Sequence, residues 1–283
     1  MTTERQPVAI VASIRFAVMA ATVAALLIGS VASYAGEPTR VLFIGKGPDH
    51  PWGTHMYLHA SRVLAQCVKR SGHVETTVAN EWPKDERVLR TIDTMVVYTD
   101  PGAERLLDGP HRETFRKLMR RGVGLVTIHW ASTVRKENFQ RLGPEWMRIL
   151  GGTWISNVGL STEASTLRRV APDHPISRGW KTSPFRDEFY LNPKLGPHAT
   201  PILEVTAKGK PLVVGWAYER PEGGRSFATT LGHFYDNFVR DDFRRIVVNA
   251  ILWSAHRDVP AGGAPVDLTD KELALPAQPA APK

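Results

Sequence analysis

Residues 122–132 read GVGLVTIHWAS, an apolar stretch that ends in a histidine and a tryptophan. Its central residues are uncharged and rich in β-branched side chains, which is typical of a strand buried on both faces. The stretch therefore predicts a strand over 123–129. In parallel sheets ligands bind outside the carboxyl ends of the strands, so this strand would hold His129 at the edge where chemistry is usually located.

The first half of the chain alternates between strand and helix patterns. Short apolar or alternating runs predict strands, and apolar residues at helical spacing predict helices. The expected strands are 39–45, 73–79 and 94–100, and the expected helices are 54–70, 111–122 and 144–150. Strands joined by helices indicate an α/β fold with a mainly parallel sheet that is covered on both faces.

The second half of the chain shows a different pattern. Three strand candidates, 200–205, 211–219 and 224–233, are joined by the short linkers TAKGK and RPEGG. This spacing predicts β-hairpins added to the parallel core. A helix over 241–257 is expected to close the domain, because its apolar residues follow one face.

The N-terminal segment, residues 1–35, has the features of a signal peptide. Arg15 precedes an apolar run of about 16 residues, which is shorter than the roughly 20 needed to span a membrane. Ser33-Tyr34-Ala35 fits the small-x-small cleavage rule. We therefore expect an exported, periplasmic protein without stable membrane insertion, with an uncleaved membrane anchor as the alternative.

The C-terminal segment, residues 259–283, is rich in proline and alanine. Such a composition offers few side chains to bury. We expect a tail that is either disordered or lies along the surface of the domain.

The overall composition limits the partners and the redox chemistry. The formal net charge is +8, but the basic residues are scattered and form no stripe with interleaved aromatic side chains. This argues against nucleic acid as a partner. Cys67 is the single cysteine, so an intrachain disulfide and a thiolate metal cluster are both excluded.

Four stretches follow one another along the chain: GLVTIHWAS, DHPISRGW, DEFY and a long C-terminal stretch that begins VVGWAYERPEGGRSFATTLGH and ends NAILWSA. In this order they make the chain, over about residues 39–258, similar to the ThuA-like family, which is named for a trehalose-utilisation protein. The resemblance implies a ThuA-like domain over 36–258 with a fold like that of class I glutamine amidotransferases, a flavodoxin-like three-layer sandwich. It also implies a role in carbohydrate catabolism through 3-keto-sugar intermediates.

The same resemblance leads to a prediction about what the protein does not do. Class I glutamine amidotransferases place a nucleophilic cysteine at the turn after a strand like 123–129, whereas this chain has His129 and Trp130 there. Cys67 lies on the apolar face of an expected helix, where a thiol is normally inert. Ser132 lacks the G-x-S-x-G context of a nucleophilic serine. We therefore expect no glutaminase activity.

The candidate site combines histidines with one pair of carboxylates. His129 and Glu188 are the expected catalytic residues, and the expected substrate contacts are His50, Trp130, Asp187 and Tyr190. The expected ligands of a divalent metal such as Zn²⁺ are His50, His129 and His233, because imidazoles and carboxylates suit such ions. His55 is ranked below His50.

Each of these residues also has a purely structural interpretation. His129 could be a core histidine bonded to a backbone carbonyl, and Asp187-Glu188 could form an exposed turn. His233 could cap the following helix, and His50 could simply be solvated in a surface loop.

Two kinds of function follow from the sequence. The first is an exported enzyme that acts as a hydrolase, lyase or isomerase on a keto-glycoside or disaccharide derivative, with a small carbohydrate as its partner. A base and a Lewis acid would suit the acidic C–H bonds beside a sugar ketone. The second is a non-catalytic sugar-binding or interaction domain. The sequence leaves the sugar, the reaction type and the oligomeric state open.

Overall fold

The computed structural model describes residues 1–2, 37–156 and 158–279. The expected signal peptide falls almost wholly on residues 3–36 and therefore lies outside the described residues. Thr39–Lys283 forms a compact unit. Within the described residues, no helix combines the length and the apolar character needed to cross a membrane.

A nine-stranded sheet runs through the unit in the order β2-β1-β3-β4-β12-β11-β10-β7-β8. Its first five strands are parallel to one another. They are β2 (Val74–Asn80), β1 (Thr39–Gly45), β3 (Thr94–Val97), β4 (Gly124–Ile128) and β12 (Arg225–Thr229). Within β1 the side chains alternate: Val41 and Phe43 pack into one core cluster, and Leu42 and Ile44 pack into the other. The parallel strands are therefore buried on both faces, as their apolar sequences predict.

The other four strands of the sheet are antiparallel. They are β11 (Lys210–Glu219), β10 (Thr200–Ala207), β7 (Leu160–Arg169) and β8 (Ser183–Tyr190). The expected hairpins are present, but β12 is not an addition to the core. It pairs antiparallel with β11 and parallel with β4, so it is the fifth strand of the parallel half. The structure is thus a mixed α/β fold with a sheet that is half parallel and half antiparallel.

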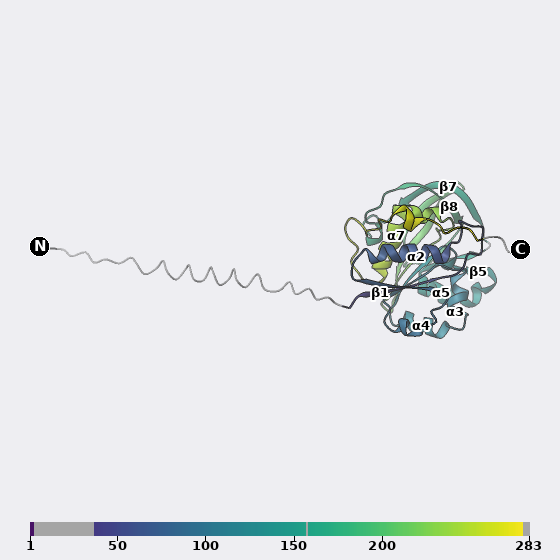
Figure 1. Ribbon diagram of the computed structural model, residues 1–283, viewed down its shortest axis with the longest axis horizontal. Helices are drawn as coiled ribbons and strands as arrows, with labels where there is room; N and C mark the ends of the chain where they lie inside the picture. Colours follow the sequence, from purple (N-terminus) through teal and green to yellow (C-terminus); the bar gives the residue numbers. More distant parts are fainter. Residues whose placement is uncertain (3–36, 157, 280–283) are drawn as a thin grey trace. The chain divides into compact units, whose positions relative to one another are not determined.

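Helices cover both faces of the parallel half (Figure 1). On one face α2 (Tyr57–Lys69) and α7 (Asp241–Ser254) contribute to the first core cluster. On the other face, α3 (Gly102–Leu107), α4 (Arg112–Arg120) and α5 (Phe139–Leu150) contribute to the second. Helix α5 begins five residues before its expected start, and Pro144 lies inside it.

Several elements were not predicted, because they are short or their apolar residues show no clear periodicity. A small second sheet contains β5 (Thr133–Arg135), β6 (Gly152–Ser156) and β9 (Lys194–Leu195). The 3₁₀ helices are η1 (Glu86–Arg90), η2 (His129–Ser132), η3 (Lys136–Asn138) and η4 (Pro175–Ser177), and α6 (Asp236–Val239) is a single turn. Residues 187–188 lie inside β8, so the alternative of an exposed turn at Asp187-Glu188 is wrong.

The C-terminal segment lies against the domain as far as it is described. Val259, Ala264, Val266 and Leu273 are buried in the first core cluster, so the expectation that this segment has little to bury is wrong. Its short helix α8 (Asp270–Leu273) begins at Thr269 with a capping box formed with Glu272. Of the two expected forms of the tail, the structure has the surface-lying one.

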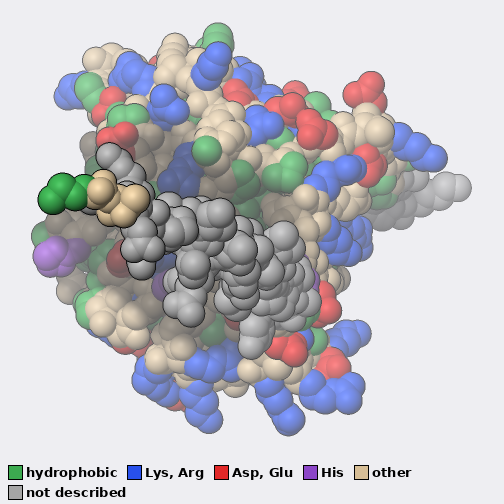
Figure 2. All heavy atoms as spheres, turned by 90° about the vertical axis from the view of Figure 1, so that its left-hand side faces the viewer, with side chains coloured by type: hydrophobic (Ala, Val, Ile, Leu, Met, Phe, Trp, Pro, Cys, Tyr) green, Lys and Arg blue, Asp and Glu red, His purple; other side chains and the backbone are tan. Residues whose placement is uncertain are grey.

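Charged side chains are spread over the surface of the unit. On the face seen in Figure 2, Lys and Arg side chains lie around the periphery, with Asp and Glu among them. This distribution agrees with the scattered basic residues in the sequence.

Candidate active site

The candidate site lies at the carboxyl ends of three parallel strands, of which β4 and β12 are neighbours and β1 is separated from β4 by β3. His129 directly follows β4, His233 follows β12 by four residues, and His55 lies in the loop after β1. The expected strand 123–129 ends one residue early, because His129 has a positive φ of 55° and starts η2. Such a backbone conformation costs a non-glycine residue about 1–3 kcal/mol, and the cost is typical of functional turns.

Backbone pairing between two loops brings His55 to His233. His55 N donates to His233 O at 3.0 Å, and Tyr235 N donates to Gly53 O at 2.8 Å. Thr54 and Phe234 form an isolated antiparallel bridge between these bonds. The loop after β1 is therefore fastened to the loop after β12, although the two are about 180 residues apart in sequence.

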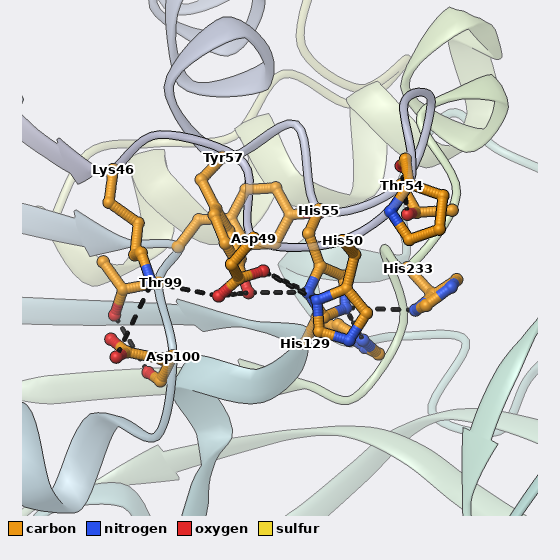
Figure 3. Close-up of polar contacts among 12 residues, drawn as sticks. Lys46, Asp49, His50, Thr54, His55, Tyr57, Thr99, Asp100, His129 and His233 are labelled. Carbon is orange, nitrogen blue, oxygen red and sulfur yellow. Dashed lines mark hydrogen bonds and ion pairs between the residues drawn. The ribbon is translucent and has the colours of Figure 1, made fainter. Parts of the chain in front are cut away.

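Three imidazoles converge at this place (Figure 3). His55 Nε2 lies 3.1 Å from His129 Nε2 and 3.0 Å from His233 Nδ1. One ring nitrogen from each of the three histidines lies within 4.8 Å of the others. His55 and His129 are buried, and the side chain of His233 is 13% exposed.

The outer hydrogen bonds of two of these rings fix their tautomers. His129 Nδ1 lies 2.8 Å from the carbonyl oxygen of Thr230, which can only accept, so this nitrogen carries the proton. His55 Nδ1 lies 3.0 Å from Asp49 Oδ1 and 2.7 Å from Tyr57 Oη. The Asp49 carboxylate is ionised and can only accept, so this nitrogen also carries the proton. Both Nε2 atoms therefore turn lone pairs toward the centre of the cluster.

The contact between His55 and His129 lacks a proton. Tyr190 Oη lies 2.9 Å from His129 Nε2 and donates to it. His233 Nδ1 can donate to His55 Nε2, but His129 has no central proton to share with His55. The two Nε2 lone pairs lie 3.1 Å apart, and each has a protein donor within reach, Tyr190 Oη for His129 and His233 Nδ1 for His55. A cation at this place could take over both lone pairs.

The electrostatic environment keeps the three imidazoles neutral. Burial lowers the pKa of His55 to about 4, although the hydrogen bond to Asp49 acts in the opposite direction. Burial also lowers the pKa of His233 to about 4 and holds the pKa of His129 well below its usual value. Neutral imidazole is the form that binds metal ions, so the cluster needs no deprotonation at pH 7.

The geometry and the supporting contacts fit a divalent metal such as Zn²⁺. At zinc–nitrogen distances of about 2.0–2.1 Å, two nitrogens in a tetrahedral site lie about 3.3 Å apart, slightly more than the two contacts here. The Asp49–His55 and Thr230–His129 hydrogen bonds are the carboxylate–histidine and carbonyl–histidine contacts that orient metal ligands. The residues that could hold a metal are thus His55, His129 and His233. His50 belongs to a second, overlapping group with Asp49 and His55.

Glu188 is the carboxylate nearest to the three nitrogens. Its Oε2 lies 3.6 Å from both His129 Nε2 and His233 Nδ1, and its side chain is 17% exposed. Burial raises the pKa of Glu188, and the charge of His50 opposes this shift. A carboxylate with a raised pKa beside a cation site can act as a further ligand or as a general base.

Asp187 does not face a ligand, so its expected role in substrate binding is wrong. It is fully buried and accepts from three backbone groups: Gly232 N at 2.6 Å, Glu188 N at 2.9 Å and His233 N at 3.0 Å. Burial raises the pKa of Asp187 to about 7, although these backbone bonds act against the shift. Its carboxyl group holds the loop that carries His233.

Tyr190 reaches the site with its hydroxyl group and not with its ring. The ring is stacked between Trp154, at a centroid distance of 4.1 Å, and His129, at 4.6 Å. Both faces of the ring are therefore covered, so a sugar cannot stack on Tyr190, and its expected substrate contact stays a prediction for the hydroxyl group alone.

His50 and Trp130 lie at the more open side of the cluster. The side chain of His50 is 37% exposed, and its Nδ1 lies 2.7 Å from Asp49 Oδ1. The Trp130 ring lies 5.9 Å from the His50 ring and 5.8 Å from the His55 ring. Both side chains are within reach of a molecule that enters the cluster, so their expected substrate contacts stay predictions.

Asp49 and His55 are the members of the site that sequence reasoning missed or ranked too low. Burial alone would raise the pKa of Asp49, but hydrogen bonds from His50, Lys46 and His55 hold it well below its usual range. The sequence DHPWGTH contains both residues together with His50. The clustering of an aspartate and two histidines in one loop was the available signal.

The fold and the site define an α/β protein with a buried three-histidine cluster at the carboxyl edge of its parallel strands. Comparison with known families adds that residues 40–254 match the ThuA family, described as trehalose utilisation. The chain therefore belongs to the ThuA family. No curated protein sequence matches the chain significantly.

Two solved structures show the same fold at low sequence identity. A ThuA-like protein from Bacteroides uniformis is 16% identical, with a TM-score of 0.61, covering 84% of this chain and 99% of the other. A glutamine amidotransferase from Thermotoga maritima is 10% identical, with a TM-score of 0.50, covering 78% of this chain and 99% of the other. At such identities the likeness concerns the fold alone, which agrees with the expected class I glutamine amidotransferase-like architecture.

Proposed function

We propose that this ThuA-family protein is a metal-dependent enzyme that acts on a keto-glycoside or a keto-derivative of a disaccharide. One observation carries the proposal: two tautomer-fixed lone pairs, on His55 and His129, meet beside His233 with a carboxylate 3.6 Å away. The family description, trehalose utilisation, supports a carbohydrate as the substrate.

Each part of the site has a role in this proposal. His55, His129 and His233 would hold the metal, which, when bound, supplies a Lewis acid for a sugar carbonyl oxygen. Glu188 would remove the proton from the carbon next to the ketone, because its carboxylate is the nearest base with a raised pKa. His129, the alternative base in the sequence prediction, is less suited, because its Nδ1 is engaged by Thr230 and its Nε2 faces the other imidazoles.

The open side of the cluster would receive the sugar. His50 and Trp130 are the proposed substrate contacts, and the Tyr190 hydroxyl group would join them if it moves from His129 Nε2. Removal of a proton beside a ketone begins elimination and isomerisation, and addition of water to the elimination product completes a net hydrolysis. The proposal therefore covers lyase, hydrolase and isomerase outcomes on one substrate class.

The proposal also includes export and a particular topology. The leader-like residues 1–35 support secretion to the periplasm, and an uncleaved anchor is the alternative. The strand order β2-β1-β3-β4-β12 equals the order 2-1-3-4-5 of flavodoxin-like sheets, which supports a flavodoxin-like assignment of the parallel half.

Glutaminase activity is not part of the proposed function. Cys67 is buried in α2, and burial raises its thiol pKa to about 11. Ammonia release from glutamine that disappears in Cys67→Ser would overturn this exclusion.

The test is elemental analysis of the full-length protein purified from a host that exports it, together with His129→Ala and His233→Ala. We expect stoichiometric divalent metal in the wild type and its loss in both variants. The mature N-terminus, read by mass spectrometry on the same sample, tests cleavage after Ala35. Wild-type protein that stays metal-free after reloading with Zn²⁺ would refute the metal site, and sugar binding without turnover would favour the non-catalytic binding domain.

A further inference from the structure

We propose that a cavity beside the histidine cluster binds a second, neutral sugar ring, so that the substrate is a disaccharide or a glycoside of similar size. This inference rests on the proposed function and names its substrate more closely. The cavity has a volume of about 360 Å³. This lies in the range of small-molecule sites, about 300–1,000 Å³.

The cavity opens on the same edge of the sheet as the histidines. Glu81 and Trp82, in its wall, follow the last residue of β2, and Asp100 follows β3 by three residues. Carboxyl ends of parallel strands lie at one edge of a sheet, so the cavity and the histidine cluster are neighbours along that edge.

A row of alternating charges joins the two places. Lys46 Nζ lies 3.0 Å from Asp49 Oδ2, beside the histidines, and 3.7 Å from Asp100 Oδ2, in the cavity wall (Figure 3). Arg105 Nε donates to Asp100 Oδ1 at 2.8 Å, and the Arg105 guanidinium group also pairs with Glu81. One lysine side chain thus contacts carboxylates of both places, so the cavity and the histidine cluster adjoin.

The charges of the cavity favour a neutral ligand that both donates and accepts hydrogen bonds. The wall contains three carboxylates and two guanidinium groups, which belong to Glu81, Asp100, Glu104, Arg105 and Arg135. An anion would meet the carboxylates and a cation would meet the guanidinium groups. Sugar hydroxyl groups can donate to the first and accept from the second.

The wall also supplies an aromatic surface. The rings of Trp82 and His111 are stacked at a centroid distance of 4.6 Å and an angle of 6°, and both line the cavity. Trp82 Nε1 donates to Glu86 Oε1 at 3.2 Å, which fixes the plane of the indole. Rigid rings beside charged groups suit a ring with an apolar face and polar edges.

One carboxylate oxygen in the cavity wall, on Glu104, has no hydrogen-bond donor among the described residues. Its Oε1 accepts from Arg135 N and Asn138 Nδ2, both at 2.9 Å. Its Oε2 is buried and has no hydrogen-bond partner among the residues that the structure describes. An unpaired buried acceptor costs about 1–3 kcal/mol. A hydroxyl group bound in the cavity, with a small rotation of the carboxylate, would supply the partner.

The experiment is isothermal titration of the full-length, zinc-loaded protein with glucose and with the disaccharides trehalose, maltose, sucrose and cellobiose. We expect at least one disaccharide to bind about tenfold more tightly than glucose, since a second occupied subsite contributes about 1.4 kcal/mol. Trp82→Ala and Arg135→Ala should each remove most of this advantage of the disaccharide over glucose. Arg135 is exposed, so its variant tests the cavity even if Trp82→Ala disturbs packing.

Controls separate this inference from the proposed function. Arg87→Ala, which alters an exposed arginine paired with Asp85 outside the cavity, should bind like the wild type. Both cavity variants should keep the metal content of the wild type, so a protein without metal refutes the proposed function and not the cavity. The cavity proposal fails if no disaccharide binds better than glucose, if both variants keep the full advantage, or if inorganic phosphate or glucose 6-phosphate binds more tightly than every neutral sugar.

Discussion

Glu188 is the residue on which the proposed chemistry depends most directly. Glu188→Gln keeps the size of the side chain and removes its basicity, while the three imidazoles stay in place. We expect kcat on a 3-keto-glycoside to fall about 10²- to 10⁴-fold, the usual contribution of a general base. The bound metal should stay near the wild-type stoichiometry.

Turnover assays and elemental analysis on the same preparations check this expectation. Glu137→Gln is a matched control, because it makes the same substitution at an exposed position in η3, outside β8 and the histidine cluster. Full activity of Glu188→Gln would show that Glu188 is not the base. Loss of metal from this variant would show that Glu188 is a metal ligand instead.

Asp187 gives a second prediction, which concerns positioning and not contact with substrate. Asp187→Asn leaves one acceptor oxygen for three backbone N–H groups and turns an amide NH₂ group toward them. The loop that carries His233 should lose its fixed position, and the Zn²⁺ affinity should fall about 10- to 100-fold, as for other residues that orient metal ligands.

Competition with a chromogenic chelator measures the Zn²⁺ affinity of Asp187→Asn. A merely structural role would lower the melting temperature and leave the affinity of the folded protein unchanged. That result would show that Asp187 does not act on the site.

At this scale the sequence predicted the right types of residue better than their roles. His129, His233, Glu188 and the neighbourhood of His50 do come together, because each follows or lies within a strand of the sheet. The roles of Asp187 and Tyr190 could not be predicted, since side-chain direction in β8 depends on its pairing with β7. His55, and not His50, joins His129 and His233 because the Thr54–Phe234 bridge positions its loop. No local sequence pattern predicts this bridge between distant loops.

Among the elements, the C-terminal segment makes the clearest prediction about stability. Deletion of residues 265–283 removes the buried side chains of Val266 and Leu273. It also removes the carbonyl groups that accept from Arg244 and Tyr235. We expect the free energy of unfolding to fall by about 3 kcal/mol or more, from two buried side chains at about 1.5 kcal/mol each.

Urea unfolding followed by circular dichroism measures this loss. Deletion of 276–283 is the matched control, because it shortens the same end and keeps α8 with its capping box. Equal stability of the longer deletion and the wild type would show that the segment only lies on the surface.

Elements whose apolar residues recur with a clear helical or strand periodicity were predictable. Elements whose formation or position depends on pairing with other strands were not. The strands 39–45 and 123–129 and the helix 241–257 appear within a few residues of their expected bounds. The membership of β12 in the parallel half could not be predicted, because its sequence suits a hairpin strand equally well. The three-stranded sheet of β5, β6 and β9 has strands of two to five residues, too short for a pattern.

For the whole molecule, the sheet topology assembles the site. The ends of β1, β4 and β12 are far apart in sequence and close in space because the order β1-β3-β4-β12 sets three loops at one edge. The sequence could predict that such an edge exists. Only the complete order of the strands determines which loops meet there, and hence why three histidines share one buried place.

The buried histidines of the whole domain predict how its stability depends on pH. The pKa values of His55, His233 and His174 are lowered by burial to about 4 in the folded protein, against about 6.5 when unfolded. Between pH 4 and 6.5 the unfolded state therefore binds more protons at these groups, so the metal-free protein loses stability as pH falls through this range. Asp187 and Glu188 act oppositely, because burial raises their pKa values, that of Asp187 to about 7. They are outnumbered by these three histidines and His129, whose pKa burial also lowers.

Urea unfolding in chelator at pH values from 4.5 to 7.5 should therefore give midpoints that fall toward the acid side. His174→Gln should reduce the slope, because His174 lies outside the site and accepts from Ile176 N in its neutral form. Zn²⁺ at 100 times its dissociation constant should add about 2.7 kcal/mol at pH 7 and less at pH 4.5, where protons compete for the imidazoles. Equal stabilisation of the wild type and His129→Ala by Zn²⁺ at pH 7 would mean that the ion binds elsewhere. A midpoint that rises on acidification would mean that the histidines are not neutral in the folded state.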